Sequence, residues 1–276
     1  MGNKKYAGMP LGWILLLLPL TIRCQQPFAA GMPAYFTWGS YNQRQNDAFC
    51  FSSNTAALAR CSTLAAGLSA ERPYGITSLA RFHLAAIIPA RSGSVGVQAA
   101  YFSAMPYRET VVSLAYGRKL GSVVDLGVQA AMARTSVPAY AARSYFTASA
   151  GLILHLTSQV SSGWNVSVPR QGGGIAQALL PSPRYSMGIA YDASVLWSAA
   201  MEISRDAGSG FVAGTGFIYR PHRLICIRMG FTTGGPPVWF GIGYELKMIR
   251  LDITASVHDR LGFSPAIGLQ YQTDGK

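Results

Sequence analysis

Apolar side chains alternate one by one with small or polar residues along many short segments of this chain. The clearest case is 124–132, where the apolar positions are Val124, Leu126, Val128, Ala130 and Met132. The same period recurs in 240–246 and 251–258. A period of two places alternate side chains on opposite faces of a β-strand. One face then suits lipid, while the other carries charges, amides and glycines, which is typical of a β-barrel in a membrane.

The whole chain from residue 67 onward can be divided into such strands. They are predicted at 67–72, 78–88, 94–102, 110–118, 123–134, 144–156, 160–168, 184–192, 195–204, 211–220, 224–232, 238–246, 249–258 and 263–271. A strand of this length crosses a bilayer when it is tilted. A closed barrel also leaves no unpaired backbone groups in lipid. We therefore predict an all-β fold: a transmembrane antiparallel up-and-down β-barrel of about 14 strands.

The links between these strands alternate in length, as an up-and-down barrel requires. Short links at 120–122, 157–159, 193–194, 221–223 and 247–248 alternate with longer ones at 135–143, 169–183, 205–210, 233–237 and 259–262. Outer-membrane barrels have short periplasmic turns and longer external loops. A soluble secreted sandwich with Greek-key crossings is the least favoured alternative. Five prolines are expected in links rather than strands: Pro89, Pro138, Pro169, Pro181 and Pro221.

The N-terminus and the charge content both indicate an exported membrane protein. A basic start and the apolar run Trp13–Leu18 predict a signal peptide over 1–24. The alternative is a lipoprotein in which Cys24 is retained and acylated. The 23 basic and 11 acidic residues give a formal charge of +12, but no Lys/Arg run with interleaved aromatic residues occurs. We therefore expect attraction to outer-membrane lipid and lipopolysaccharide rather than to nucleic acid.

The cysteines form no obvious disulfide scaffold. Removal of the signal peptide with Cys24 would leave three, and an odd number argues against such a scaffold. Cys50 and Cys61 could pair across a short loop in an oxidising compartment. Two small buried residues in a packed segment are the favoured interpretation. Cys226 lies in a predicted strand without an evident partner.

Two passages resemble a known family. Residues 45–59, which contain Asp47-Ala48 and Asn54-Thr55-Ala56-Ala57-Leu58-Ala59, are similar to the N-terminal segment of FadL-like superfamily barrels, a group that includes the PorV and PorQ proteins of Bacteroidetes. Residues 251–258 and 261–265 resemble the closing hairpin of small Bacteroidetes members of this group. The resemblance implies a 14-stranded barrel whose N-terminal segment folds inside it. The final strand, 263–271, resembles the terminal strand that barrel-insertion machinery reads.

The segment 25–66 is accordingly predicted to plug the lumen of a barrel formed by 67–272, with 273–276 as a tail. Asp47–Arg60 is Ala-rich and starts near an aspartate, so we expect a short helix there. Its candidate plug residues are Asp47, Phe49, Asn54 and Leu58. The lumen of a barrel this wide cannot be filled by its own side chains, so water or a plug must occupy it.

Charged and amide residues on the polar face are the candidate lumen-lining set: Arg81, Asp125, Gln129, Glu202, Arg228, Glu245 and Asp252. They would either line a permeation path or pair with one another and with the plug, because charge in a narrow lumen needs compensation. Pairing is the favoured interpretation.

No catalytic site, metal site or cofactor is predicted, and the chain is not expected to be an enzyme. The four histidines, His83, His155, His222 and His258, have no pair at metal-ligand spacing. Two functions remain. The first is passive transport of small molecules, with hydrophobic ones favoured, across the outer membrane. The second is a non-transporting accessory or anchor barrel for protein secretion, surface attachment or motility, with a secretion or surface-protein partner.

Overall fold

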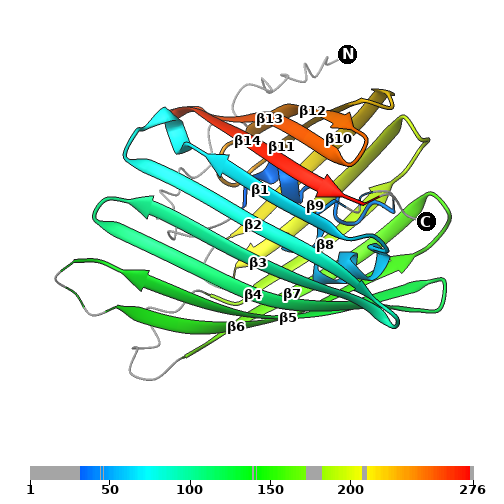
Figure 1. Cartoon of the computed structure of the whole chain (residues 1–276), viewed down its shortest axis with the longest axis horizontal. Helices are drawn as coiled ribbons and strands as arrows, with labels where there is room; N and C mark the ends of the chain where they lie inside the picture. Colours follow the sequence, from blue (N-terminus) through cyan, green and yellow to red (C-terminus); the bar gives the residue numbers. More distant parts are fainter. Residues whose placement is uncertain are drawn as a thin grey trace, which may run out of the picture.

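The computed structural model is a closed antiparallel barrel in which consecutive strands pair and the first strand closes against the last (Figure 1). The structure describes residues 32–43, 45, 47–138, 140, 142–171, 182–206 and 210–273. Its strands are β1 (Ala65–Glu71), β2 (Leu79–Ala90), β3 (Gly93–Ala104), β4 (Tyr107–Leu120), β5 (Val124–Ser136), β6 (Arg143–His155), β7 (Val160–Gln171), β8 (Arg184–Tyr191), β9 (Trp197–Asp206), β10 (Phe211–His222), β11 (Ile225–Thr232), β12 (Val238–Leu246), β13 (Ile249–His258) and β14 (Gly262–Gln272). The predicted fold class is confirmed. Within the described ranges, no helix is long and apolar enough to span a bilayer.

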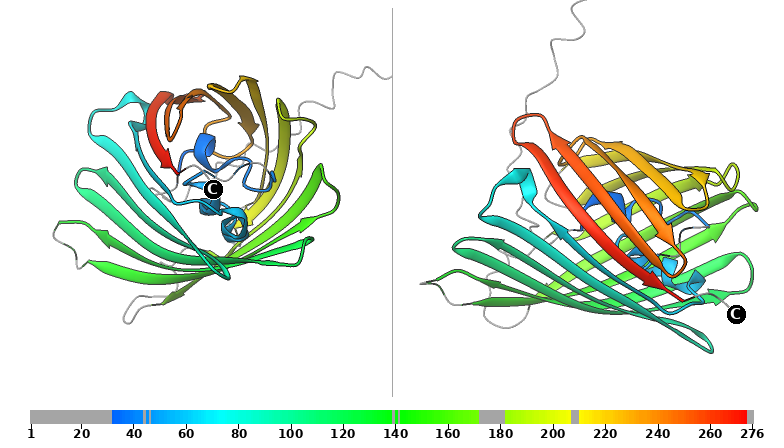
Figure 2. Two further views of the ribbon diagram at one scale, coloured as in Figure 1. Left: turned by 45° about the vertical axis from the view of Figure 1, so that its right-hand side comes forward. Right: turned by 45° about the horizontal axis from the view of Figure 1, so that its top comes forward.

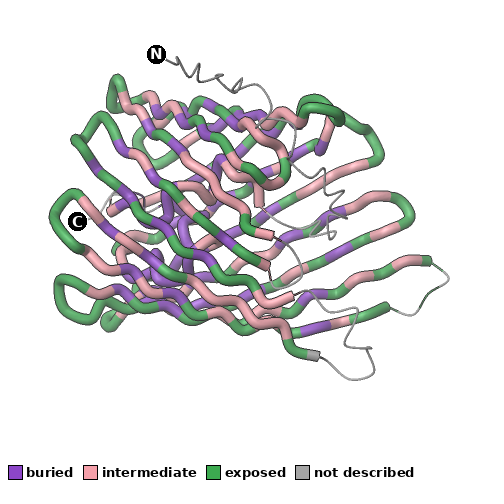
Figure 3. Tube along the Cα trace, turned by 180° about the vertical axis from the view of Figure 1, so that it is seen from behind, coloured by how far each residue is buried: buried purple, intermediate pink, exposed green. Residues whose placement is uncertain are grey.

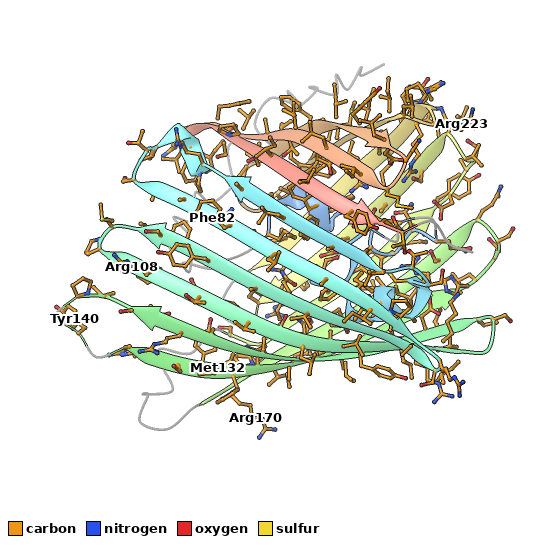
Figure 4. All side chains as sticks on the ribbon, viewed as in Figure 1. Phe82, Arg108, Met132, Tyr140, Arg170 and Arg223 are labelled. Atoms are coloured by element: carbon orange, nitrogen blue, oxygen red, sulfur yellow. The ribbon has the colours of Figure 1, made fainter. Side chains whose placement is uncertain are left out.

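Large apolar residues cover the outside of the barrel, and small or polar residues face inward. Along β14, buried and exposed residues alternate almost without exception. Alternation of this kind is also visible along other strands (Figure 3). Phe82 and Met132, labelled in Figure 4, are each 45% exposed on the outer wall. Exposure of so many large apolar side chains to water would cost free energy, so the outer wall is suited to contact with lipid. Basic residues lie at both rims, with Arg108 and Arg170 at one end and Arg223 at the other (Figure 4).

The two ends of the barrel differ. At one end, which we call the loop end, β5 ends and β6 begins, and β7 ends and β8 begins; the opposite turn end carries short links such as 91–92 and 247–248. In an outer-membrane barrel the short turns are periplasmic, so we expect the loop end to face outward.

Three of the prolines that were expected in links lie in strands, so that prediction was wrong for Pro89 in β2, Pro169 in β7 and Pro221 in β10. Each is within two residues of its strand's end, where a missing N–H costs little. Pro221 also falls where the pairing of β10 with β11 shifts register. Pro138 lies in the β5–β6 link as expected, and Pro181 is outside the described residues.

The described residues between 32 and 64, here called the N-terminal segment, lie inside the barrel (Figure 2). The described part contains a short helix, α1 (Ala34–Thr37), and two 3₁₀ turns, η2 (Cys50–Ser52) and η3 (Thr55–Arg60). The single helix expected over Asp47–Arg60 was therefore wrong. The Asn54 side chain accepts a hydrogen bond from the Ala56 N–H and starts a new turn there. Packing around several sides of the segment also favours a winding path over one helical face.

The strand pairing of the wall is interrupted where β1 ends at the loop end. Glu71 is the last residue of β1 and pairs with Ala266 and Arg81, whereas β14 and β2 both extend further. The turn η4 (Pro73–Gly75) bridges this place, with the Arg72 N–H donating to the Pro265 carbonyl oxygen at 3.0 Å. A loop, rather than a hydrogen-bonded strand, thus separates β14 from β2 there.

Candidate functional site: the occupied lumen

The N-terminal segment packs against inward-facing glycines on ten strands. At each of them an added Cβ would lie 3.0 Å or less from an atom of the segment: Gly67, Gly96, Gly117, Gly127, Gly151, Gly163, Gly188, Gly214, Gly216, Gly241 and Gly268. These glycines allow the segment to approach the backbone of the wall closely. The barrel interior is therefore shaped to this segment rather than left as a uniform channel.

Tyr41 shows this packing most clearly. Its ring lies between Gly163 of β7 and Gly188 of β8, so that a Cβ on either glycine would collide with it. Ser161 of β7 donates a hydrogen bond to the Tyr41 carbonyl oxygen. Burial, aided by the charge of Glu202, raises the pKa of the Tyr41 hydroxyl well above its usual value. Tyr41 therefore stays neutral and acts as an aromatic packing residue.

A charged network joins the segment to β11, β13 and β14. Asp252, which is fully buried, accepts hydrogen bonds from the Tyr35 hydroxyl at 2.7 Å, from Arg250 at 2.6 Å and from Gln270 at 2.9 Å. Arg228, 1% exposed, donates to Asp47 at 3.0 Å. Each buried charge thus has an opposite charge and further hydrogen bonds, which offset the cost of desolvation.

A second charged network lies across the barrel, on β5 and β6. Asp125 is 2.7 Å from Nε2 of His155 and 3.6 Å from Nε of Arg60. Arg60 also donates to the backbone carbonyls of Ser40 and Asn42, two residues of the same segment. Arg60 therefore stabilises the fold of the segment and also attaches the segment to the wall.

A third attachment lies at the turn end. Asp192, in the β8–β9 link, accepts hydrogen bonds from the Asn42 side chain at 3.2 Å and from the Gln43 N–H at 2.8 Å. The Gln43 side chain donates to the carbonyl oxygen of Thr157, in the β6–β7 link, at 2.9 Å. The three attachments distribute the contacts of the segment around the barrel circumference.

All seven residues expected to line the lumen belong to the inward face of their strands. Asp125, Arg228 and Asp252 are in the networks described above. Glu245 forms an ion pair with Arg250 at 3.8 Å, and Arg81 forms one with Glu71. Gln129 and Glu202 are partly exposed. Whether any of them lines a permeation path stays a prediction.

The four candidate plug residues all contact the wall. Asp47 pairs with Arg228, Phe49 meets Gly67, Asn54 meets Gly151, and Leu58 meets both Gly96 and Gly117. Sequence reasoning missed Tyr35, Trp38, Tyr41 and Arg60, as well as the glycines. The recurrence of glycine at polar-face positions of successive strands was the available signal for close packing inside the barrel.

The described residues contain no group of three or more His, Cys, Asp and Glu side chains placed to bind a metal ion. His155 ends β6 at the turn end, while His258 ends β13 at the loop end. These two histidines therefore cannot share a ligand.

A polar cavity of about 250 Å³ opens at the turn end beside the first charged network. Its lining includes Arg220, Arg228, Arg250 and Lys247, with Asp47 and Glu245 opposite in charge. Basic side chains exceed acidic ones in this lining. The cavity thus provides a water-accessible approach to the ion pairs that hold the segment.

An apolar groove of about 800 Å³ runs along the wall over β12, β13, β14 and the adjoining parts of β1 and β2. Small residues such as Ala70, Ala80 and Ala255 lie along it, and large ones such as Phe82 and Phe240 border it. Glu71 and Leu79 also line it, although Glu71 pairs with Arg81 inside the barrel and Leu79 packs on the inward-facing Phe102 cluster. The groove therefore reaches the inner face where β1 ends.

The barrel is similar to solved hydrocarbon-transport proteins. It matches the toluene transporter TbuX of Ralstonia pickettii with a TM-score of 0.62 at 10% identity, over 90% of this chain and 100% of that one. It matches the toluene transporter TodX of Pseudomonas putida with a TM-score of 0.60 at 11% identity, over 88% and 97%. The monoaromatic hydrocarbon channel CymD matches with a TM-score of 0.58 at 11% identity, over 90% and 96%. No protein-family model and no curated protein matches the chain. At these identities the likeness establishes a shared fold: the chain is a 14-stranded barrel of the outer-membrane type.

Proposed function

We propose that this protein is an outer-membrane barrel for passive transport of small, preferentially hydrophobic molecules, and that its N-terminal segment is the plug of the lumen. The observation that carries the proposal is that a separate segment, rather than the side chains of the wall, occupies the barrel. A segment held by side-chain contacts can shift without breaking the hydrogen bonds of the wall.

The contacts of the segment have the character expected of a plug. They consist of ion pairs, side-chain hydrogen bonds and aromatic rings seated on glycines, such as Arg228 with Asp47 and Tyr41 with Gly188. A strand of the wall, by contrast, is held by a continuous backbone ladder. Displacement of the segment therefore costs fewer backbone hydrogen bonds than any opening of the wall.

The apolar surfaces favour hydrophobic solutes. Phe102, Tyr107 and Leu79 form an inward-facing apolar cluster near the loop end. Leu79 also lines the apolar groove, which continues along the outside. A hydrophobic molecule that entered at the loop end would meet the Phe102 cluster, pass the Glu71–Arg81 ion pair and reach the apolar groove at the end of β1. Such a molecule gains free energy by avoiding water along this route.

The structural similarity supports transport as well. The proteins named above are described as toluene transporters or hydrocarbon channels, and this chain aligns over nearly their whole length. Their fold agrees with the resemblance of residues 45–59 and 251–265 to FadL-like barrels. The proposed location is the outer membrane, reached with a signal peptide over 1–24 and surrounded by anionic lipid and lipopolysaccharide.

Two assays test the proposal on the same variants. The purified, refolded protein is compared in planar bilayers with a variant lacking 25–62, which keeps β1 whole. Uptake of a hydrophobic fluorescent probe is measured in intact cells of a Gram-negative host that express each form. Arg118→Gln, at an exposed position of β4, is the control for handling and expression.

We expect the full-length protein to conduct little and the shortened one to form stable pores. We expect both to raise probe uptake above that of cells without the protein. If the shortened variant migrates as a folded, heat-modifiable barrel but neither conducts nor raises uptake, the transport proposal is rejected.

A further inference from the structure

Two of the cysteines in the N-terminal segment are neighbours in space. Cys50 begins η2 and Cys61 follows η3, and their Sγ atoms are 3.4 Å apart. Both side chains are buried, at 0% and 3% exposure. Cys226, on β11, has no cysteine partner in the described part of the chain. The two thiols are thus placed for a bond with each other and shielded from other reagents.

We propose that Cys50 and Cys61 are oxidised to an intrachain disulfide when the protein reaches an oxidising compartment. The bond would close a loop across 51–60. This inference goes beyond transport, since it concerns how the segment inside the barrel is held in shape.

The loop that the bond would close is the part of the segment that contacts β3, β4, β5 and β6. Its residues Phe51 and Leu58 meet Gly96, and Leu58 also meets Gly117. Thr55 meets Gly127, and Asn54 meets Gly151. A covalent bond at the base of this loop reduces the number of conformations of the loop when it is free of the wall. The disulfide would therefore preserve the shape that fits these glycines.

The chemistry requires a disulfide oxidant, such as an exported thiol–disulfide oxidoreductase or glutathione disulfide. One cysteine thiolate attacks a sulfur of the donor disulfide and releases one donor thiolate. The second cysteine thiolate attacks the resulting mixed disulfide and releases the other donor thiolate. Two protons and two electrons leave the protein in total, and the donor is reduced to two thiols.

Burial dictates when the bond forms. The hydrogen bond with Cys61, together with burial, raises the pKa of the Cys50 thiol well above its usual value. A protonated, enclosed thiol reacts slowly. Oxidation is therefore expected before the strands close around the segment, or during slow openings of the folded barrel.

The test uses the full chain refolded in detergent with a mixture of oxidised and reduced glutathione. The product is denatured in N-ethylmaleimide, so that burial cannot protect any free thiol, and is then digested with trypsin. Arg60 lies between the two cysteines, so cleavage places Cys50 in peptide 45–60 and Cys61 in peptide 61–81. The same digest is made of protein extracted from outer membranes.

We expect the two peptides to be linked. The linked species should have a mass about 2 Da below the summed masses of the two peptides with free thiols, and it should disappear on reduction. Cys226 in the same sample should be alkylated, and in a Cys50→Ser variant Cys61 should be alkylated too. Alkylation of both Cys50 and Cys61 in the refolded protein would overturn the proposal. A bond in the refolded protein but not in extracted protein would instead show that the location lacks an oxidant, which overturns the proposal as stated for the cell.

Discussion

Arg228 on β11 donates a 3.0 Å hydrogen bond to the carboxylate of Asp47, a residue 181 positions earlier in the chain. Both groups are buried, and each is the nearest opposite charge to the other. This pair is one of the contacts that join the N-terminal segment to the wall, and it can be tested by substitution.

Replacement of Arg228 by Met should weaken this attachment. Asp47 would keep only the more distant Arg250, at 3.9 Å, as a basic partner. We expect a loss of about 3 kcal/mol in unfolding free energy, the cost typical of a broken buried ion pair. We also expect more frequent openings in planar bilayers. Arg118→Gln should change neither quantity, and an Arg228→Met protein as silent and as stable as wild type would contradict the assigned role.

The second charged network should matter in the same way. In an Asp125→Ala protein, Arg60 would lose its carboxylate partner and His155 its hydrogen-bond acceptor. Denaturant unfolding should show a stability loss of about 3 kcal/mol. Asp259→Asn, at an exposed site in the β13–β14 link, provides the matched control. Equal stability of the two variants would mean that the carboxylate of Asp125 is dispensable.

The packing of the N-terminal segment against the inward-facing glycines can be tested through Tyr41. A Gly188→Ala change places a methyl group against the Tyr41 ring and should destabilise the protein by about 1–3 kcal/mol, as overpacking does. In a Tyr41→Ala background the same change should cost much less, because the clashing ring is gone. A double-mutant cycle measured by denaturant unfolding would show this coupling. Strictly additive effects would indicate that the ring does not rest on Gly188.

The groove provides a test of the route for hydrophobic molecules. An Ala70→Phe change fills the groove near the end of β1, on the outer face, without altering a charged residue. We expect severalfold lower uptake of a hydrophobic probe, with unchanged conductance of the variant that lacks 25–62. Val128→Phe, on the outer face of β5, adds similar bulk elsewhere on the wall. If both changes lower uptake equally, the groove is not the route.

The strands could be predicted closely because lipid requires a period of two. Strand β13 shows why, since Leu251 and Ile253 face outward and Asp252 faces inward. A shift of the pattern by one residue would place the charge of Asp252 in the bilayer. The prolines were harder, because the cost of a proline depends on which side of a strand its missing N–H would face. Pro265 illustrates this point, since it lies in β14 opposite Ala255. Its carbonyl oxygen faces Arg72, beyond the end of β1, so its N–H is missing on a side where no strand needs it.

The interior of the barrel could be predicted only in part. Inward charges such as Arg228 and Asp252 were recognisable from alternation. Their partners Asp47 and Tyr35 lie about 200 residues away in sequence, and no local pattern encodes that contact. The more specific likeness to PorV and PorQ stays a prediction.

The close packing of the N-terminal segment against the inward-facing glycines also bears on the order in which the barrel is assembled. The segment comes first in the chain, yet it touches wall residues as late as Gly268 on the final strand. The rings of Trp38 and Tyr41 pack so closely against glycines of the wall that insertion of the segment into a closed barrel would be sterically hindered. We therefore expect the strands to assemble around the segment before β14 pairs with β1. The contact of Tyr35 with Asp252 can form only after β13 is in place, so the late steps of folding complete the wall and fix the segment inside it.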